Sequence, residues 1–359
     1  LSIKESMSIA RTDRATVIAN MLADLDEVIN SNYLPASYDA DNKGRITRWA
    51  AMAIKAKIYL FEGNWTQVKN ITSTIMTEGG FRLFGSYAGL FEIANEYNSE
   101  VILDAQYRPT SREHQMMYAF LPPSLGGYSQ LSPLQELVDS YIMLDGKTIR
   151  ETGTSFDESN PYANRDPRLK ATVMYTGNSY TLADGTEVVI NCEKGEGKDG
   201  YGVGSDCSAT GYYIKKYWDN TYRATLYSGL NPILIRYADI LLMNAEALAE
   251  LGELDKTAWD ATIKPIRDRA GFTLASAVEF PEGASKDKLI EIVRNERRSE
   301  LALEGHRHKD IIRWRIADDV LNGWCHGLKT NEVVGTDNGY VRVENRAFNA
   351  NKHYLWPIP

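Results

Sequence analysis

The sequence has no stretch of about 18 consecutive apolar residues, which is roughly the length a helix needs to cross a bilayer. It also has no basic run, because 48 Asp and Glu residues outnumber 40 Lys and Arg residues and give a formal net charge of −8. Nucleic-acid-binding proteins usually carry a basic patch, so nucleic acid is disfavoured as a partner. No phosphate loop, dinucleotide fingerprint or Ser/His/Asp arrangement stands out. We therefore expect no cofactor and no enzymatic activity.

Cysteine is scarce, with three residues in 359. Cys192 and Cys207 flank a polar, glycine-rich loop that a disulfide could close in an oxidising compartment. Two unpaired thiols are an equally good interpretation, and Cys325 would then also be unpaired.

Candidate metal ligands are few and poorly spaced. His306 and His308 are two positions apart, which places them on different faces of a helix and suits no common metal site. The spacing of the acidic residues between the first two cysteines does not match an EF-hand, so we interpret them as solvated charge. We therefore predict no metal site. The acidic residues are Glu193, Glu196, Asp199 and Asp206.

Two parts of the sequence have the apolar periodicity of amphipathic helices. Near the N-terminus the predicted helices span residues 12–31, 45–61 and 65–78, and the last two form a hairpin about as long as one tetratricopeptide unit. Helical order resumes at Ile233 with a second hairpin, in which Pro265 should kink or restart the second helix. Such hairpins cannot bury their apolar faces alone, so we expect them to stack on one another.

The middle of the chain is punctuated by Gly, Pro, Asn, Asp and Tyr, with only short strand-like runs such as residues 100–107 and 187–192. Binding surfaces are often carried by loops that a rigid scaffold holds in place. We predict a mainly α, single-domain fold of tetratricopeptide-like helical hairpins covered by an irregular, loop-rich layer with a few short strands. The predicted parts are the scaffold at 1–80 and 233–318, the ligand-binding layer at 81–232, and an irregular C-terminal segment at 319–359.

One predicted helix, from Lys286 to Glu304, carries three glutamates in its apolar half, spaced i, i+4 and i+8. Buried carboxylates require cations or hydrogen-bond donors. They could pair with arginines from other segments, or two of them, Glu296 and Glu300, could be the acid and base of a glycoside hydrolase. We favour the ion network, because catalytic pairs usually come from different elements that line a cleft. Its predicted members are Arg165, Arg168, Arg236, Glu296, Arg297, Glu300 and Glu304.

Several segments together resemble the SusD/RagB family, in the order in which that family has them. They include GRITRWAAMAIKAKIYLFEGNW (44–65), ILIRYADILLMNAEALAELG (233–252) and, as the strongest match, RNERRSELALEGHRHKDIIRW (294–314). The resemblance implies a lipoprotein on the outer face of the outer membrane that binds oligosaccharides and delivers them to a TonB-dependent transporter. The RagB branch implies peptide uptake as an alternative. Family members begin with a lipidated cysteine and further helices, so we expect the chain to lack its N-terminal part.

The resemblance also implies that aromatic side chains of the layer stack on sugar rings while polar groups bind the hydroxyls. Two aromatic-rich stretches, residues 107–130 and 217–229, are the candidates for this surface. The predicted glycan-binding residues are Arg112, His114, Gln115, Tyr118, Phe120 and Tyr128 in the first stretch, and Trp218, Asn220, Tyr222 and Arg223 in the second.

Overall fold

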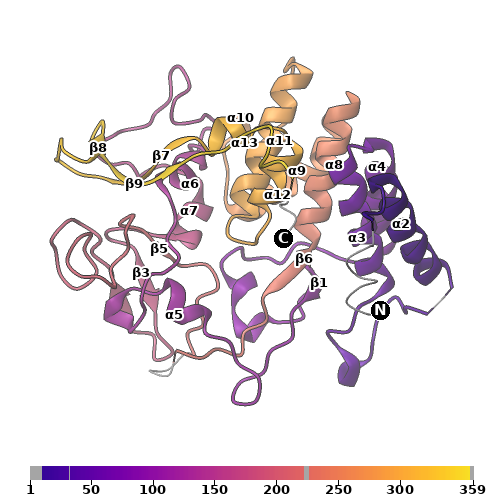
Figure 1. Cartoon of the computed structure of the whole chain (residues 1–359), viewed down its shortest axis with the longest axis horizontal. Coiled ribbons are helices and arrows are strands. Elements are labelled where there is room, and N and C mark those ends of the chain that lie inside the picture. The colour runs from indigo at the N-terminus through magenta and orange to yellow at the C-terminus, as the bar shows by residue number, and fades with distance from the viewer. Residues whose placement is uncertain (1–9, 32, 222–225, 356–359) are drawn as a thin grey trace.

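The computed structural model describes residues 10–31, 33–221 and 226–355. Its scaffold is a row of helices in which α2 packs on α3, α3 on α4, α4 on α8, and α8 on both α9 and α11 (Figure 1). None of the described helices combines the length and apolarity that a bilayer crossing requires. The scaffold helices are α2 (Arg14–Asn30), α3 (Arg48–Glu62), α4 (Trp65–Glu78), α8 (Tyr237–Leu251), α9 (Lys256–Ala270) and α11 (Lys286–Glu300).

The two predicted helical hairpins are present, and each reverses at a glycine followed by a capping residue. Gly63 has φ 70° at the end of α3, and the Asn64 side chain then accepts from the first turn of α4. Gly252 has φ 75° at the end of α8, and Asp255 caps α9. Because glycine adopts positive φ without a Cβ clash, these sequences stop one helix and allow the next to fold back.

Three details of the scaffold differ from the sequence-based expectation. Residues Ile233–Arg236 form strand β6 rather than the first turn of a helix, and α8 begins at Tyr237. Helix α9 continues through Pro265 without a restart. Helix α11 ends at Glu300, so Glu304 lies beyond the helix end. Between them, Leu303 adopts φ 64°, which is incompatible with a continuing α-helix.

The layer between the two helical parts contains short strands and one-turn helices around its own apolar core. Strand β1 (Val101–Asp104) pairs antiparallel with β6 (Ile233–Arg236) and so attaches the layer to the start of α8. A core of buried aromatic and aliphatic side chains, including Tyr180 and Tyr213, holds the loops together. Its other elements are α5 (Met116–Phe120), α6 (Gln135–Ser140), α7 (Pro167–Thr172), β2 (Val173–Met174), β3 (Ser179–Thr181), β4 (Glu187–Val189), β5 (Tyr213–Ile214) and the 3-10 turns η2 (Gly89–Phe91), η3 (Ile93–Asn95) and η4 (Pro123–Leu125); η1 (Ala40–Asn42) precedes α3.

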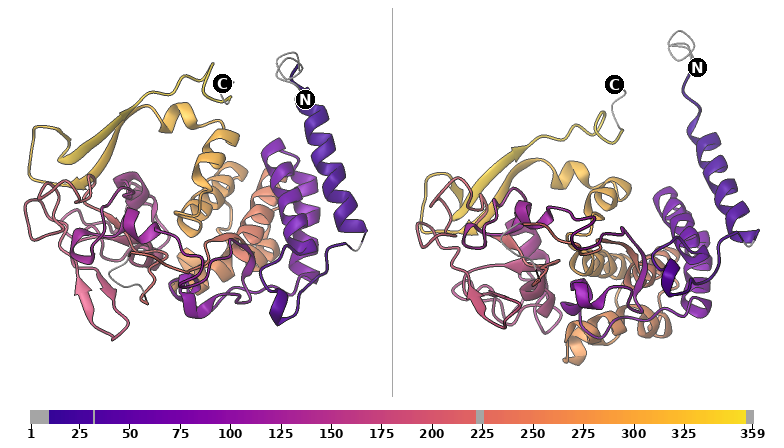
Figure 2. Two further views of the ribbon diagram at one scale, coloured as in Figure 1. Left: turned by 60° about the horizontal axis from the view of Figure 1, so that its bottom comes forward. Right: turned by 90° about the horizontal axis from the view of Figure 1, so that it is seen from below.

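The C-terminal part is more regular than predicted. After α10 (Ala275–Val278), α12 (Arg307–Arg313) and α13 (Ala317–Val320), the chain forms a three-stranded antiparallel sheet in the order β7-β9-β8. In both views of Figure 2 this sheet crosses over the layer. Its strands are β7 (Gly323–Lys329), β8 (Thr336–Asp337) and β9 (Tyr340–Arg346).

A buried ion network joins α11 to the layer. Glu300 is fully buried and pairs with Arg168 at 2.8 Å, with Arg236 at 2.6 Å and with Arg269. Glu304 pairs with Arg236 and with Lys216 at 2.7 Å. Burial alone would raise the pKa of Glu304, but the charges of Arg236 and Lys216 lower it to about 2.

Charge is balanced within this network. Five carboxylates face five cations, and every one of them is buried or nearly so. Desolvation of these charges is therefore offset by mutual pairing rather than by water. The network comprises Glu100, Asp166, Glu296, Glu300 and Glu304 with Arg168, Lys216, Arg236, Arg267 and Arg269.

Two arginines assigned to this network from the sequence lie outside it. Arg165 donates to the backbone carbonyls of Val138 and Tyr141, because the end of α6 leaves carbonyls without helical partners. Arg297 pairs instead with Asp239 at 2.6 Å and with Asp310 at 2.9 Å, and so joins α8 to α12.

Candidate functional site

The two aromatic-rich stretches predicted to bind ligand lie next to each other in the layer. His114 and Ser228 form an isolated antiparallel bridge in which each backbone N–H donates to the other's carbonyl at 2.9 Å. Stretches that are about 100 residues apart in the sequence therefore share one surface. The described part of the second stretch stops at residue 221 and resumes at 226.

Two tyrosines of the first stretch form a stacked and partly accessible aromatic surface. The rings of Tyr118 and Tyr128 stack with centroids 4.1 Å apart and planes 23° from parallel, and Tyr128 is 40% exposed. Their backbones are joined because Tyr128 N–H donates to the Tyr118 carbonyl at 3.0 Å. The pKa of Tyr118 is raised by partial desolvation, by its hydrogen bond with Tyr128 and by the charge of Asp206.

Local structure explains how this pair is held. In α5 the side chains of Met117 and Phe120 are buried in the core of the layer, so Tyr118 lies on the outer side of this single turn. The return loop passes so close that a Cβ on Gly127 would lie 2.0 Å from the Leu121 carbonyl oxygen. Only glycine fits at this point, and the loop is fixed against α5 as a result.

Three of the predicted polar residues are exposed on the same two stretches. Arg112 places its guanidinium 5.4 Å from the centroid of the Tyr107 ring. Gln115 precedes α5, and Asn220 follows the buried Asp219. Amide and guanidinium groups of this kind can form directional hydrogen bonds with hydroxyl groups. Tyr222 and Arg223 lie outside the described residues.

The structure gives other roles to three predicted residues. Phe120 is 3% exposed and belongs to the core, so its ring cannot stack on a ligand. His114 uses both ring nitrogens internally, since Nε2 donates to the Leu230 carbonyl and Nδ1 accepts from a backbone N–H. The indole N–H of Trp218 donates to a backbone carbonyl at 2.9 Å, and its ring packs against a buried tyrosine.

Sequence reasoning missed a polar cavity of about 850 Å³ between the layer and the C-terminal sheet. Three tyrosines and two asparagines are among its lining residues, and one of these tyrosines stacks on a further ring at 4.0 Å. The sheet contributes one wall, and this wall was predicted to be irregular. The five residues are Asn160, Tyr162, Tyr212, Asn331 and Tyr340.

The loop from residue 191 to 207 lies between this cavity and the tyrosine pair. Lys194 lines the cavity, while Asp199 accepts from the backbone N–H of Ser124 beside the pair. Cys192 and Cys207 are not bridged, and burial raises the pKa of the Cys192 thiol to about 12. Across the described residues, no group of three or more His, Cys, Asp or Glu side chains is arranged to hold a metal ion.

The architecture defines a class of protein in which stacked helical hairpins support an irregular layer. The model of the SusD family matches residues 90–359, which is most of the chain, and the chain therefore belongs to the SusD family.

Several known proteins are similar to this chain in sequence or in fold. The chain is 28% identical over 346 residues to SusD-like protein P25 of Formosa agariphila, covering 89% of this chain and 59% of that protein. A SusD-like carbohydrate-binding protein of Bacteroides fragilis superposes with a TM-score of 0.87 at 29% identity, covering 100% of this chain and 72% of that one. A second SusD-like protein of that species gives a TM-score of 0.80 at 26% identity, over 99% of this chain and 70% of that one. The chain thus spans little more than half the length of the curated relative.

Proposed function

We propose that the protein binds oligosaccharides at the cell surface and holds them without changing them. One observation supports this most strongly, namely the stacked and accessible tyrosine pair of Tyr118 and Tyr128 on a rigid base, with exposed amide and guanidinium groups on the same stretches. The C–H faces of sugar rings are weakly apolar and suit aromatic surfaces, while the hydroxyls require directional donors and acceptors.

The proposal excludes glycoside hydrolysis by the glutamates of α11. Glu296 and Glu300 are at most 1% exposed, and each pairs with two or more arginines. The charges of Arg269, Arg236 and Arg168 hold the pKa of Glu300 well below its usual range, although burial alone would raise it. A general acid needs a raised pKa and access to the substrate, and Glu300 has neither.

In the proposed role, the protein is held on the outer face of the outer membrane by a lipid anchor and passes its ligand to a TonB-dependent transporter. Family membership and the likeness to a SusD-like carbohydrate-binding protein support this proposal. The transporter would then select among the captured molecules, and the protein itself would need only moderate affinity.

The test is a calorimetric screen of purified protein against neutral oligosaccharides and against mixed peptides, with product analysis of every mixture. We expect binding to at least one glycan without release of products. Tyr128→Ala and Tyr118→Ala should each weaken it about tenfold, because each removes one stacking ring. Tyr33→Ala is the matched control, since Tyr33 is 72% exposed before α3 and lies outside the proposed surface.

Two results would contradict the proposal. Binding of peptides alone would replace sugar with peptide as the ligand class. Glycan binding that responds equally to Tyr128→Ala and Tyr33→Ala would show that the site lies elsewhere.

A further inference from the structure

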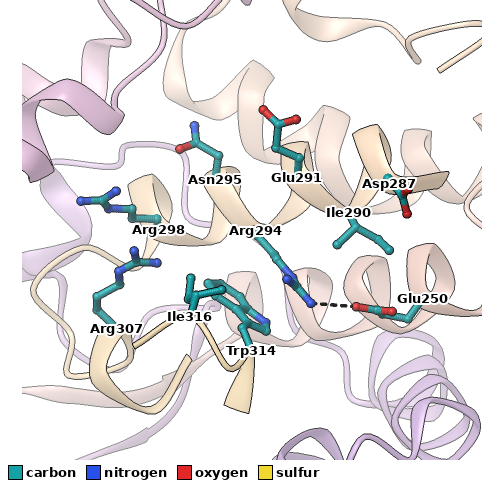
Figure 3. A pocket seen from close by; sticks show the side chains of 10 residues that line it. All are labelled: Glu250, Asp287, Ile290, Glu291, Arg294, Asn295, Arg298, Arg307, Trp314 and Ile316. Carbon is teal, nitrogen blue, oxygen red and sulfur yellow. Dashed lines mark hydrogen bonds and ion pairs between the residues drawn. The ribbon is translucent and has the colours of Figure 1, made fainter. Parts of the chain in front are cut away.

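A pair of arginines, Arg298 and Arg307, lies where α11 and α12 meet, between two cavities. Each cavity has a volume of about 560 Å³, and both arginines line both cavities. Figure 3 shows their guanidinium groups close together at one end of the first cavity, with Glu250 and Asp287 at the opposite end. These cavities are separate from the tyrosine surface described above.

The pair is not neutralised in the described part of the chain. Arg298 donates to the backbone carbonyl of Glu136, and neither guanidinium forms an ion pair with a carboxylate there. Neighbouring arginines on the same two helices do form such pairs, since Arg297 pairs with Asp239 and Arg313 with Glu246.

The surroundings of Arg298 and Arg307 disfavour the charged form of both side chains. Burial, followed by the charge of Arg307, lowers the pKa of Arg298 to about 10. Burial also lowers the pKa of Arg307, against the opposing charge of Asp310. A bound oxoanion would stabilise two partly buried, mutually repelling guanidinium groups that form no direct ion pair with a described carboxylate.

The surroundings indicate from which side a ligand would reach the pair. The first cavity also contains Glu250, Asp287 and Glu291, which would repel an anion. The second is lined largely by apolar side chains and includes the 43%-exposed indole ring of Trp324 at the start of β7. An anionic ligand with an apolar face would therefore lie in the second cavity.

Most of the acidic groups in the second cavity are already occupied. Glu136 accepts from the backbone and the ring of His326, and Asp310 pairs with Arg297 and Arg313. Asp319 lies on the exposed turn α13. Two of the three carboxylates in this cavity therefore already have partners, and the cavity volume is within the range of about 300–1,000 Å³ that small-molecule sites occupy.

We propose that Arg298 and Arg307 bind the acid group of a short acidic saccharide, whose sugar ring stacks on Trp324. The acid group is a sulfate ester or a uronic carboxylate, since each presents at least two negatively charged acceptor oxygens that two guanidinium groups can hold. This second site goes beyond the neutral-sugar surface formed by the tyrosines.

The experiment compares binding of a sulfated disaccharide, a uronic acid disaccharide, their neutral counterpart and inorganic sulfate, by calorimetry at low salt. We expect at least one acidic disaccharide to bind about tenfold more tightly than the neutral one. Arg307→Gln and Trp324→Ala should each remove most of this difference, whereas Tyr128→Ala should leave it unchanged. Arg45→Gln is the matched control, because Arg45 is an exposed arginine before α3.

Thermal unfolding separates this role from a purely structural one. Arg307→Gln should keep or raise the melting temperature in the absence of ligand, because it removes a repulsion and no ion pair within the described residues. Inorganic sulfate should raise the melting temperature of the wild type and have less effect on Arg307→Gln.

Three outcomes would overturn the proposal. One is equal affinity for acidic and neutral disaccharides, and another is binding of acidic peptides with no response to acidic sugars. The third is inorganic sulfate binding as tightly as the acidic disaccharides, which would leave no role for the ring on Trp324. Loss of neutral-glycan binding in Tyr128→Ala would test the proposed tyrosine surface, and it would not test the arginine site.

Discussion

Replacing Glu300 with glutamine tests whether the buried network holds the layer on the scaffold. The substitution keeps the shape of the side chain and removes one negative charge from a set of five carboxylates and five cations. Arg168, Arg236 and Arg269 would then share one carboxylate fewer in a site that water does not reach. The network would carry an excess positive charge.

The size of the effect follows from what each arginine keeps. Breaking a buried ion pair costs about 3–5 kcal/mol when the remaining charge has no other partner. Here Arg168 retains Asp166 and Arg269 retains Glu100, so we expect the lower limit, about 3 kcal/mol. For a chain of 359 residues that corresponds to a fall in melting temperature of roughly 4 °C.

The assay is thermal and urea unfolding of Glu300→Gln beside Glu291→Gln. Glu291 lies on the same helix, but its side chain is 61% exposed and its one ion pair among the described residues is with Lys288, so its replacement should change stability by less than about 0.5 kcal/mol. Equal stability of the two variants would refute the view that Glu300 is part of an essential charge balance. Loss of a glycan-cleaving activity in a fully folded Glu300→Gln protein would instead revive the hydrolase interpretation.

Three further predictions follow from single groups. The paired carboxylate of Glu304 has a pKa lowered to about 2, so its pairing stabilises the fold fully above the ordinary glutamate pKa of about 4.3. This stabilisation is lost as the pH falls from about 4.3 toward 2. The melting temperature should therefore fall over this pH range, and a constant melting temperature would contradict the pairing. A thiol reagent at pH 8 should modify Cys207 before Cys192, which is buried with a pKa raised to about 12, and mass spectrometry of the labelled peptides would show the order. Gly127→Ala should displace the loop that carries Tyr128 and weaken glycan binding at least as much as Tyr128→Ala, as calorimetry of the two folded variants would measure.

The helical scaffold could be predicted from the sequence because its signals are local. Apolar periodicity gives the helices, and Gly63 and Gly252 with their following caps give the reversals. Glu296, Glu300 and Glu304 were also visible as an anomaly in the apolar half of the predicted helix. Which arginines meet them could not be read from spacing, because the partners come from segments as far apart as Arg168 and Arg269.

The loop-rich layer was predictable only as a region of the chain. Helical spacing of Met117 and Phe120 would have placed Phe120 in the core, although five residues are too few for a clear periodic signal. The C-terminal sheet was missed because neither long strand alternates cleanly: β7 contains two glycines, and β9 is rich in polar and charged residues. The polar cavity was missed for the same reason, since one of its walls comes from that sheet.

The layer owes its rigidity to long-range links rather than to regular structure. Pairing of β1 with β6 attaches one side of the layer to the start of α8. The ion pairs of Arg168 with Glu300 and of Lys216 with Glu304 attach another part of the layer to the C-terminal end of α11. Loops held in this way lose little further entropy when a ligand binds, so modest aromatic contacts can give useful affinity. Since these anchors lie away from the tyrosine pair, the residues of the binding surface can change without loss of the fold. One scaffold can therefore present different surfaces to different ligands.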